Sequence, residues 1–135
     1  MRQSLPSIKA IAFLPCSLLS PDILEKYLAG VPIGIFAATT PIEHYGNASC
    51  EAVLEYDNGS SMENATLKFT TTDEIQDAQE LAFVLTDVQG RSHIIGHREP
   101  PYPMLEIGKV IDKDSNIHEV KVTFSSRKAL IRCYL

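Results

Sequence analysis

From residue 49 onward the sequence repeats one pattern, in which short segments of alternating apolar and polar residues are separated by turn-forming residues. The first two segments are "CEAVLEYD" and "ENATLKFTTT", and "DNGS" between them supplies the turn. Alternation with a period of two is typical of a β-strand with one face in the core and the other in solvent. The pattern predicts a hairpin whose inward face consists of Cys50, Ala52, Leu54, Tyr56, Ala65, Leu67 and Phe69.

Two further hairpins follow along the chain. "LAFVLTDV" and "RSHIIGHR" are joined by "QG", in which Gly90 can adopt a positive φ. "MLEIGKVID" and "HEVKVTFSS" are joined by "KDSN", and "LIRCYL" predicts a last strand. We expect the hairpin from Leu81 to Ile95 to form the centre of the core. Its buried residues would be Phe83, Leu85 and Ile94, or their opposite-face neighbours if the register shifts by one.

The N-terminal part predicts two strands and one short helix. "SIKAIAFL" (Ser7 to Leu14) and "VPIGIFAA" are the strand segments, the second near an edge because of Pro32. "SPDILEKYLAG" has the marks of a helix, with Ser20 as N-cap and Gly30 as terminator. The apolar stripe of this helix would consist of Ile23, Leu24, Tyr27 and Leu28.

These elements define a fold class. Roughly eight or nine strands and one helix indicate a mainly β protein, an antiparallel β-sandwich or barrel with one short N-terminal helix. Only "TTDEIQDAQEL" interrupts the strands, with a single helical turn expected after Thr72. A chain of 135 residues is long enough to bury a core without disulfides or metals, so we expect a single β-rich domain over residues 1–135.

Charge and hydropathy bear on the partners. The formal net charge of −5 argues against nucleic acid or an anionic membrane surface, because both attract basic proteins. No apolar run is long enough to span a bilayer. "IKAIAFLPCSLLS" has some features of a lipoprotein signal, but Pro15 precedes Cys16 where a small residue is needed. We therefore interpret this run as a buried strand.

The cysteines, Cys16, Cys50 and Cys133, are three in number and far apart. No CxxC pair is present, so the sequence does not predict a zinc knuckle. Each cysteine lies among apolar neighbours, which indicates reduced thiols in the core and a reducing compartment.

The stretch "HIIGHREPPYPMLEIG" gathers two histidines near the middle of the chain. In a strand, His93 and His97 would point to the same face but lie roughly 13 Å apart, too far for both to bind one metal ion without a bulge. Glu99 could complete a cupin-like ligand set, yet the closely spaced histidine pair of such a set is absent, and the position of His118 relative to these residues stays open. We expect no metal site.

The proline cluster of the same stretch has two interpretations. Pro100, Pro101 and Pro103 restrict φ and favour extended geometry, which suits a rigid bridge between two strands. The same rigidity would lower the entropy cost of presenting an exposed Tyr102 to a partner. Tyr102 with these three prolines is therefore the candidate interface, and both interpretations stay open.

Catalytic motifs are missing from the sequence. It contains no GxxxxGK[ST], GxGxxG or GxSxG, so phosphate-binding loops and nucleophile elbows are not predicted. Paired carboxylates such as Asp73 with Glu74 are typical of a solvated surface. We expect no catalytic residues, no cofactor and no enzymatic activity.

The segments "ENATLKFTTTDEI" and "LAFVLTDVQGRSHIIGHREPPYPMLEI" give the chain a family resemblance. From about Ser7 onward it resembles small β-rich virion structural and assembly proteins of Bacteroidales phages and prophages. The resemblance implies a role in the head–tail connector or tail region, other virion proteins as partners, and a location in the virion after assembly in the host cytoplasm. It carries no functional residues over to this chain. The alternative is a bacterial cell-envelope β-sandwich module that binds glycan or protein.

The distribution of charge adds an expectation about self-association. Between Leu5 and Ile42 the only charged residues are Lys9 and three on the proposed helix, as expected for strands covered on both faces. A neighbouring subunit in a homo-oligomeric ring would cover them. The competing explanation is that the helix and the "TTDEIQDAQ" loop cover them within one chain.

Overall fold

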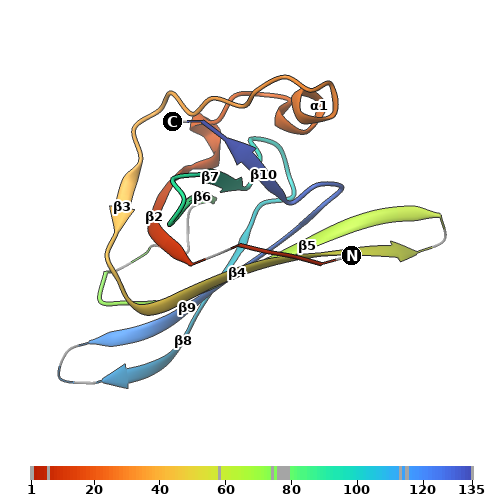
Figure 1. Ribbon diagram of the computed structural model, residues 1–135. Helices are drawn as coiled ribbons and strands as arrows, with labels where there is room; N and C mark the ends of the chain where they lie inside the picture. Colours follow the sequence, from red (N-terminus) through yellow and green to blue (C-terminus); the bar gives the residue numbers. More distant parts are fainter. Residues whose placement is uncertain are drawn as a thin grey trace.

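The computed structural model describes residues 2–5, 7–57, 59–73, 75, 80–112, 114 and 116–134. Two antiparallel five-stranded sheets stack on each other, as Figure 1 shows. Sheet A has the order β1-β4-β5-β9-β8 and sheet B the order β10-β7-β6-β2-β3. Sheet A contains β1 (Arg2–Ser4), β4 (His44–Asp57), β5 (Ser60–Thr71), β8 (Met104–Asp112) and β9 (Ile117–Ser126). Sheet B contains β2 (Ile8–Pro15), β3 (Thr40–Ile42), β6 (Leu81–Asp87), β7 (Ser92–Ile95) and β10 (Leu130–Cys133).

This arrangement confirms the predicted mainly β class with one short N-terminal helix. Each sheet ends in edge strands among the described residues, so the molecule is sandwich-like and not a closed barrel. The short 3₁₀ helix η1 (Cys16–Leu18) and the helix α1 (Ile23–Leu28) lie between β2 and β3 in the chain. The loop "TTDEIQDAQEL" lies largely outside the described residues, so its expected helical turn is not described.

The main core, here called the inner cluster, lies between the two sheets. Sheet A contributes every second residue of β5 and β9, as the alternation predicted. The predicted hairpin from Leu81 to Ile95 provides the facing strands of sheet B. Burial of side chains from both sheets is the dominant favourable term in folding. The members of the inner cluster that are most deeply buried include Leu67, Phe69, Phe83, Leu85, Ile95, Val120 and Val122.

A second core, the outer cluster, covers the opposite face of sheet B. Ile23 of α1 and Ile33 and Ile35 of the following segment pack against Val84 and Ile94 of the sheet. The central strands β6 and β7 are therefore covered on both faces within one chain, and residues 81–85 of β6 are all buried. The helix and residues 33–37 provide this cover on the outer face, and Ile75 of the long loop joins the inner cluster. Lys9 and Ala10 of β2 stay exposed, and cover by a neighbouring subunit stays a prediction.

Several N-terminal details differ from the sequence expectations. "VPIGIFAA" is not a strand but a covering segment, held by a single parallel bridge between Gly34 and Tyr134. The helix is capped at Asp22, not Ser20, and Asp22 has φ 59°. Its backbone N–H donates to Glu99 Oε1 at 3.2 Å, which connects the start of the helix to a residue distant in sequence. Of the predicted apolar stripe only Ile23 is buried, whereas Tyr27 and Leu28 are exposed, so the short helix contacts the sheet mainly through its first turn.

The turn between β6 and β7 is longer than expected. Phe83, Leu85 and Ile94 are buried as predicted, but the connection is Val88–Arg91 and not the two residues "QG". The carboxylate of Asp87 accepts hydrogen bonds from the backbone N–H groups of Gln89 and Arg91 at 2.9 and 3.0 Å. Gly90 has φ 83°, which a side chain would disfavour.

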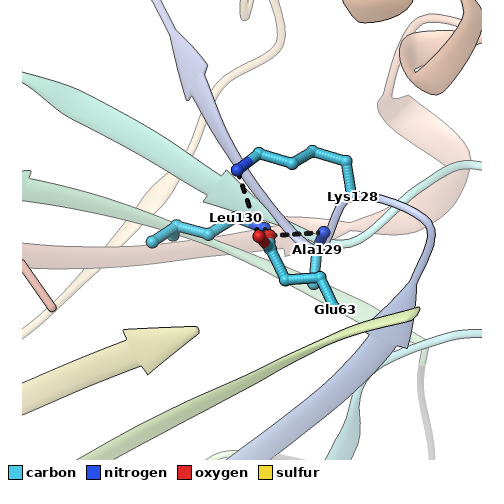
Figure 2. Close-up of polar contacts among 4 residues, drawn as sticks. All are labelled: Glu63, Lys128, Ala129 and Leu130. Atoms are coloured by element: carbon cyan, nitrogen blue, oxygen red, sulfur yellow. Dashed lines mark hydrogen bonds and ion pairs between the residues drawn. The ribbon is translucent and has the colours of Figure 1, made fainter. Parts of the chain in front are cut away.

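One carboxylate joins the two sheets. Glu63, on β5 of sheet A, is 6% exposed and points at the start of β10 in sheet B (Figure 2). Its Oε1 accepts hydrogen bonds from the backbone N–H groups of Ala129 and Leu130, both at 2.9 Å. Its Oε2 forms an ion pair with Lys128 Nζ at 3.1 Å. A buried carboxylate thus satisfies two backbone donors and one ammonium where the chain enters its last strand.

Replacement of Glu63 tests the importance of this contact. We expect Glu63→Ala to lower the free energy of unfolding by about 3 kcal/mol or more, because two buried backbone donors lose their acceptor. Glu63→Gln keeps one acceptor oxygen and should lose about half as much. The measurement is denaturant unfolding, with Glu119→Ala on the exposed surface of β9 as the control. Equal stability of Glu63→Ala and the control variant would contradict the prediction.

Candidate interaction surfaces

The proline-rich segment, residues 96–103, carries the chain from β7 in sheet B to β8 in sheet A. Pro100 and Pro101 are exposed and joined by a cis peptide bond, and Pro103 is half-buried. Tyr102 packs against the outer cluster and is half-buried. The expectation of an exposed Tyr102 is therefore wrong, because its ring is part of the packing under this segment.

Contacts at Gly96 and at Glu99 hold this segment in place. Gly96 has φ 127°, and a Cβ placed there would lie 2.8 Å from the Cβ of Ala82, so no larger residue fits. Glu99 accepts the hydrogen bond from the first residue of the helix region, Asp22. These contacts favour the rigid-bridge interpretation. The interface role of Tyr102, Pro100, Pro101 and Pro103 stays a prediction.

The cysteines are free and buried, as the sequence predicted. Burial, with a smaller effect of Glu80, raises the pKa of the Cys16 thiol to about 11. Burial raises the pKa of Cys50 and of Cys133 to about 12. Because the thiolate is the nucleophile, these protonated thiols are unsuited to covalent catalysis at neutral pH. Cys16 also borders a cavity of about 320 Å³ shared with Glu80, Arg98 and Tyr102.

The side chains of His93, His97 and His118 are all buried. The His97 ring packs edge-on against Phe124 with ring centroids 5.1 Å apart. His93 lies on β7 and pairs with Arg132 of β10, while His118 pairs with Thr71 of β5. Within the described ranges no group of three or more metal-ligating side chains comes together. The absence of bound metal in the purified protein stays a prediction.

Burial lowers the pKa of His93 and of His97, because the charged imidazolium loses its hydration. For His93 the nearby Arg132 adds to the effect. The unfolded chain therefore binds protons below pH about 6.5 that the folded chain does not bind. The stabilising contribution of the two neutral rings is complete above that pH and is lost as the pH falls below it.

This linkage predicts a pH dependence of stability. Between about pH 7 and about pH 5 the free energy of unfolding should fall, by at most about 1.4 kcal/mol per pH unit for each of the two histidines. The double variant His93→Gln/His97→Gln should flatten this slope in chemical denaturation at several pH values. His44→Gln, at a half-buried histidine of β4, is the control and should keep the slope. An unchanged slope in the double variant would show that the two rings do not cause it.

A two-stranded ribbon extends beyond the rest of sheet A. The pairing of β4 with β5 continues to Asp57 opposite Ser60, whereas β1 pairs with β4 only as far as Val53 and β9 pairs with β5 only as far as Glu63. Residues 54–57 and 60–62, here called the arm, therefore have no further strand on either side among the described residues. Figure 1 shows this hairpin reaching past the strands of sheet B.

The arm exposes apolar side chains on both faces. Tyr56 is 74% exposed and Met62 is 46% exposed, and strand alternation places them on opposite faces. The sequence placed Tyr56 on the inward face of its strand, which is correct, but the facing sheet does not extend far enough to cover it. Isolated two-stranded ribbons are marginally stable in water, so such a ribbon gains from a partner.

Sequence reasoning did not single out the arm or the residues at the end of β10. One signal for the arm was present, because the alternation of β4 and β5 extends over 14 and 12 residues. Typical strands have about 5–6 residues, and a pair of this length exceeds what a small sandwich can cover. No comparable local signal marks Arg132, whose surroundings come from distant parts of the chain.

Comparison with known proteins identified no relative: no family model, no curated protein and no solved structure matches this chain. Neither helix in the described part of the chain has the length and apolar character needed to cross a bilayer.

Proposed function

We propose that this protein is a structural protein of phage or prophage virions, acting in assembly as a head–tail connector, tail completion or tail tube component. It works through protein–protein interfaces, without catalysis, and forms a homo-oligomer that contacts other virion proteins. The phage context rests on the resemblance of the central segments. The observation that carries the assembly role is the arm, with Tyr56 and Met62 exposed on its two faces.

Physical arguments support an assembly role for the arm. A ribbon whose two edges pair with no further strand in the described part of the chain offers backbone donors and acceptors to a neighbouring chain. Burial of its apolar side chains contributes about 25 cal/mol per Å² removed from water. Soluble homo-oligomers close by symmetry, and a ring of more than two copies uses two different, complementary surfaces on each copy.

Light scattering over a concentration series tests the proposed function. We expect the wild-type chain to increase in mass with concentration, and the double variant Tyr56→Ser/Met62→Ser to shift this transition to concentrations about tenfold higher or more, because it removes the apolar groups of both arm faces. Val88→Ser removes an equally exposed apolar side chain, 60% exposed, at the β6–β7 turn and serves as the control. A wild-type chain that stays monomeric, or an arm variant that associates like the control, would contradict the proposed function.

A further inference from the structure

A pocket of about 220 Å³ lies between the end of β10 and the segment that follows α1. Tyr27, Val31 and Pro32 form one wall, and Arg132 and Tyr134 form the other. Backbone hydrogen bonds from Tyr134 to the Ile33 carbonyl at 2.8 Å and from Ile35 to the Tyr134 carbonyl at 2.9 Å hold the two walls together. Pockets for whole small molecules measure about 300–1,000 Å³. This one is smaller and suits side chains.

Arg132 gives this pocket an unmatched positive charge. Its Nε is buried and has no hydrogen-bond partner, and its guanidinium carbon lies 5.1 Å from the centre of the Tyr134 ring. Among the described residues no carboxylate forms an ion pair with it. The Glu63 carboxylate near the start of β10 is already engaged by Lys128. The Arg132 side chain as a whole is half-buried, and a carboxylate is the group that a guanidinium binds best, through two parallel hydrogen bonds.

The arm carries a matching pair of side chains. Glu55 and Met62 lie directly opposite each other in the β4–β5 pairing and therefore share one face of the ribbon. Glu55 is exposed and Met62 is 46% exposed, so a carboxylate and an apolar thioether stand side by side. A guanidinium with aromatic and aliphatic walls is the complement of this pair, because thioethers make favourable contacts with aromatic rings.

We propose that the arm of one copy occupies this pocket in a second copy, with the Glu55 carboxylate on Arg132 and Met62 against the tyrosines and Val31. This inference rests on the proposed assembly function and deepens it by naming both surfaces. The arm extends from sheet A, away from α1 and β10 (Figure 1). Residues of α1, of the segment after it and of β10 line the pocket. Contacts between two different surfaces are head-to-tail, and they close into rings when the rotation between copies allows it.

Charge exchange tests the proposed pairing. Arg132→Glu and Glu55→Arg should each weaken self-association about tenfold or more, because each places like charges together at the contact. The double variant, with the charges exchanged, should recover to within about threefold of the wild-type concentration dependence, since opposite charges meet again. The two single variants mixed in equal amounts should also associate with each other. The measurement is sedimentation velocity over a concentration series.

Two control variants keep the test specific. Arg98→Glu and Glu106→Arg reverse exposed charges outside the pocket and the arm and should not change self-association. Circular dichroism checks that each variant folds. If Arg132→Glu does not fold, Arg132→Gln takes its place, and we expect Arg132→Gln to weaken self-association as well.

The outcomes separate this inference from the proposed function. If the double arm variant Tyr56→Ser/Met62→Ser loses association but Arg132→Glu and Arg132→Gln keep it, the arm binds elsewhere, and the pocket assignment is overturned while the assembly role stands. The same conclusion follows if both single charge variants weaken association and the double variant does not recover. If the wild-type chain never associates, both proposals fail.

Discussion

The contacts of the Glu63 carboxylate hold the two sheets together where the chain enters its last strand. They join β5 of sheet A to the first residues of β10 in sheet B. Glu63 is also the last residue of β5, toward the arm, that pairs with β9. The same carboxylate forms its ion pair with Lys128 and not with Arg132. One buried acid thus ties the base of the arm to the start of the last strand.

The alternation in the sequence predicted correctly which side chains of a strand face inward. It did not predict which other elements lie next to those side chains. Alternation placed Leu67 and Phe69 correctly in the core, because a period of two follows from strand geometry alone. The same rule placed Tyr56 inward, yet it is exposed because alternation does not reveal how far the opposite sheet extends. The hydrogen bond from Asp22 at the helix start goes to Glu99, and the pocket that contains Arg132 is lined by residues of α1 and the segment after it, so local sequence patterns carry neither.

The proline-rich segment shows how rigidity serves packing in this fold. It crosses between the sheets, and its Tyr102 packs against the outer cluster that covers the central strands of sheet B. The proposed assembly uses two surfaces outside this packing, the arm and the pocket beside β10. Each of these two surfaces combines exposed apolar groups with a charged side chain. This combination favours specific association over non-specific aggregation.

The proposed contact between the arm of one copy and the pocket of the next is open to direct measurement by hydrogen–deuterium exchange of the 135-residue chain at low and high concentration. We expect backbone amides of the arm and of residues 30–34 to gain protection together as the concentration rises, while β6 in the core exchanges alike at both concentrations. Protection of neither region, or of the arm without the pocket, at concentrations where the mass of the particle has increased would contradict it.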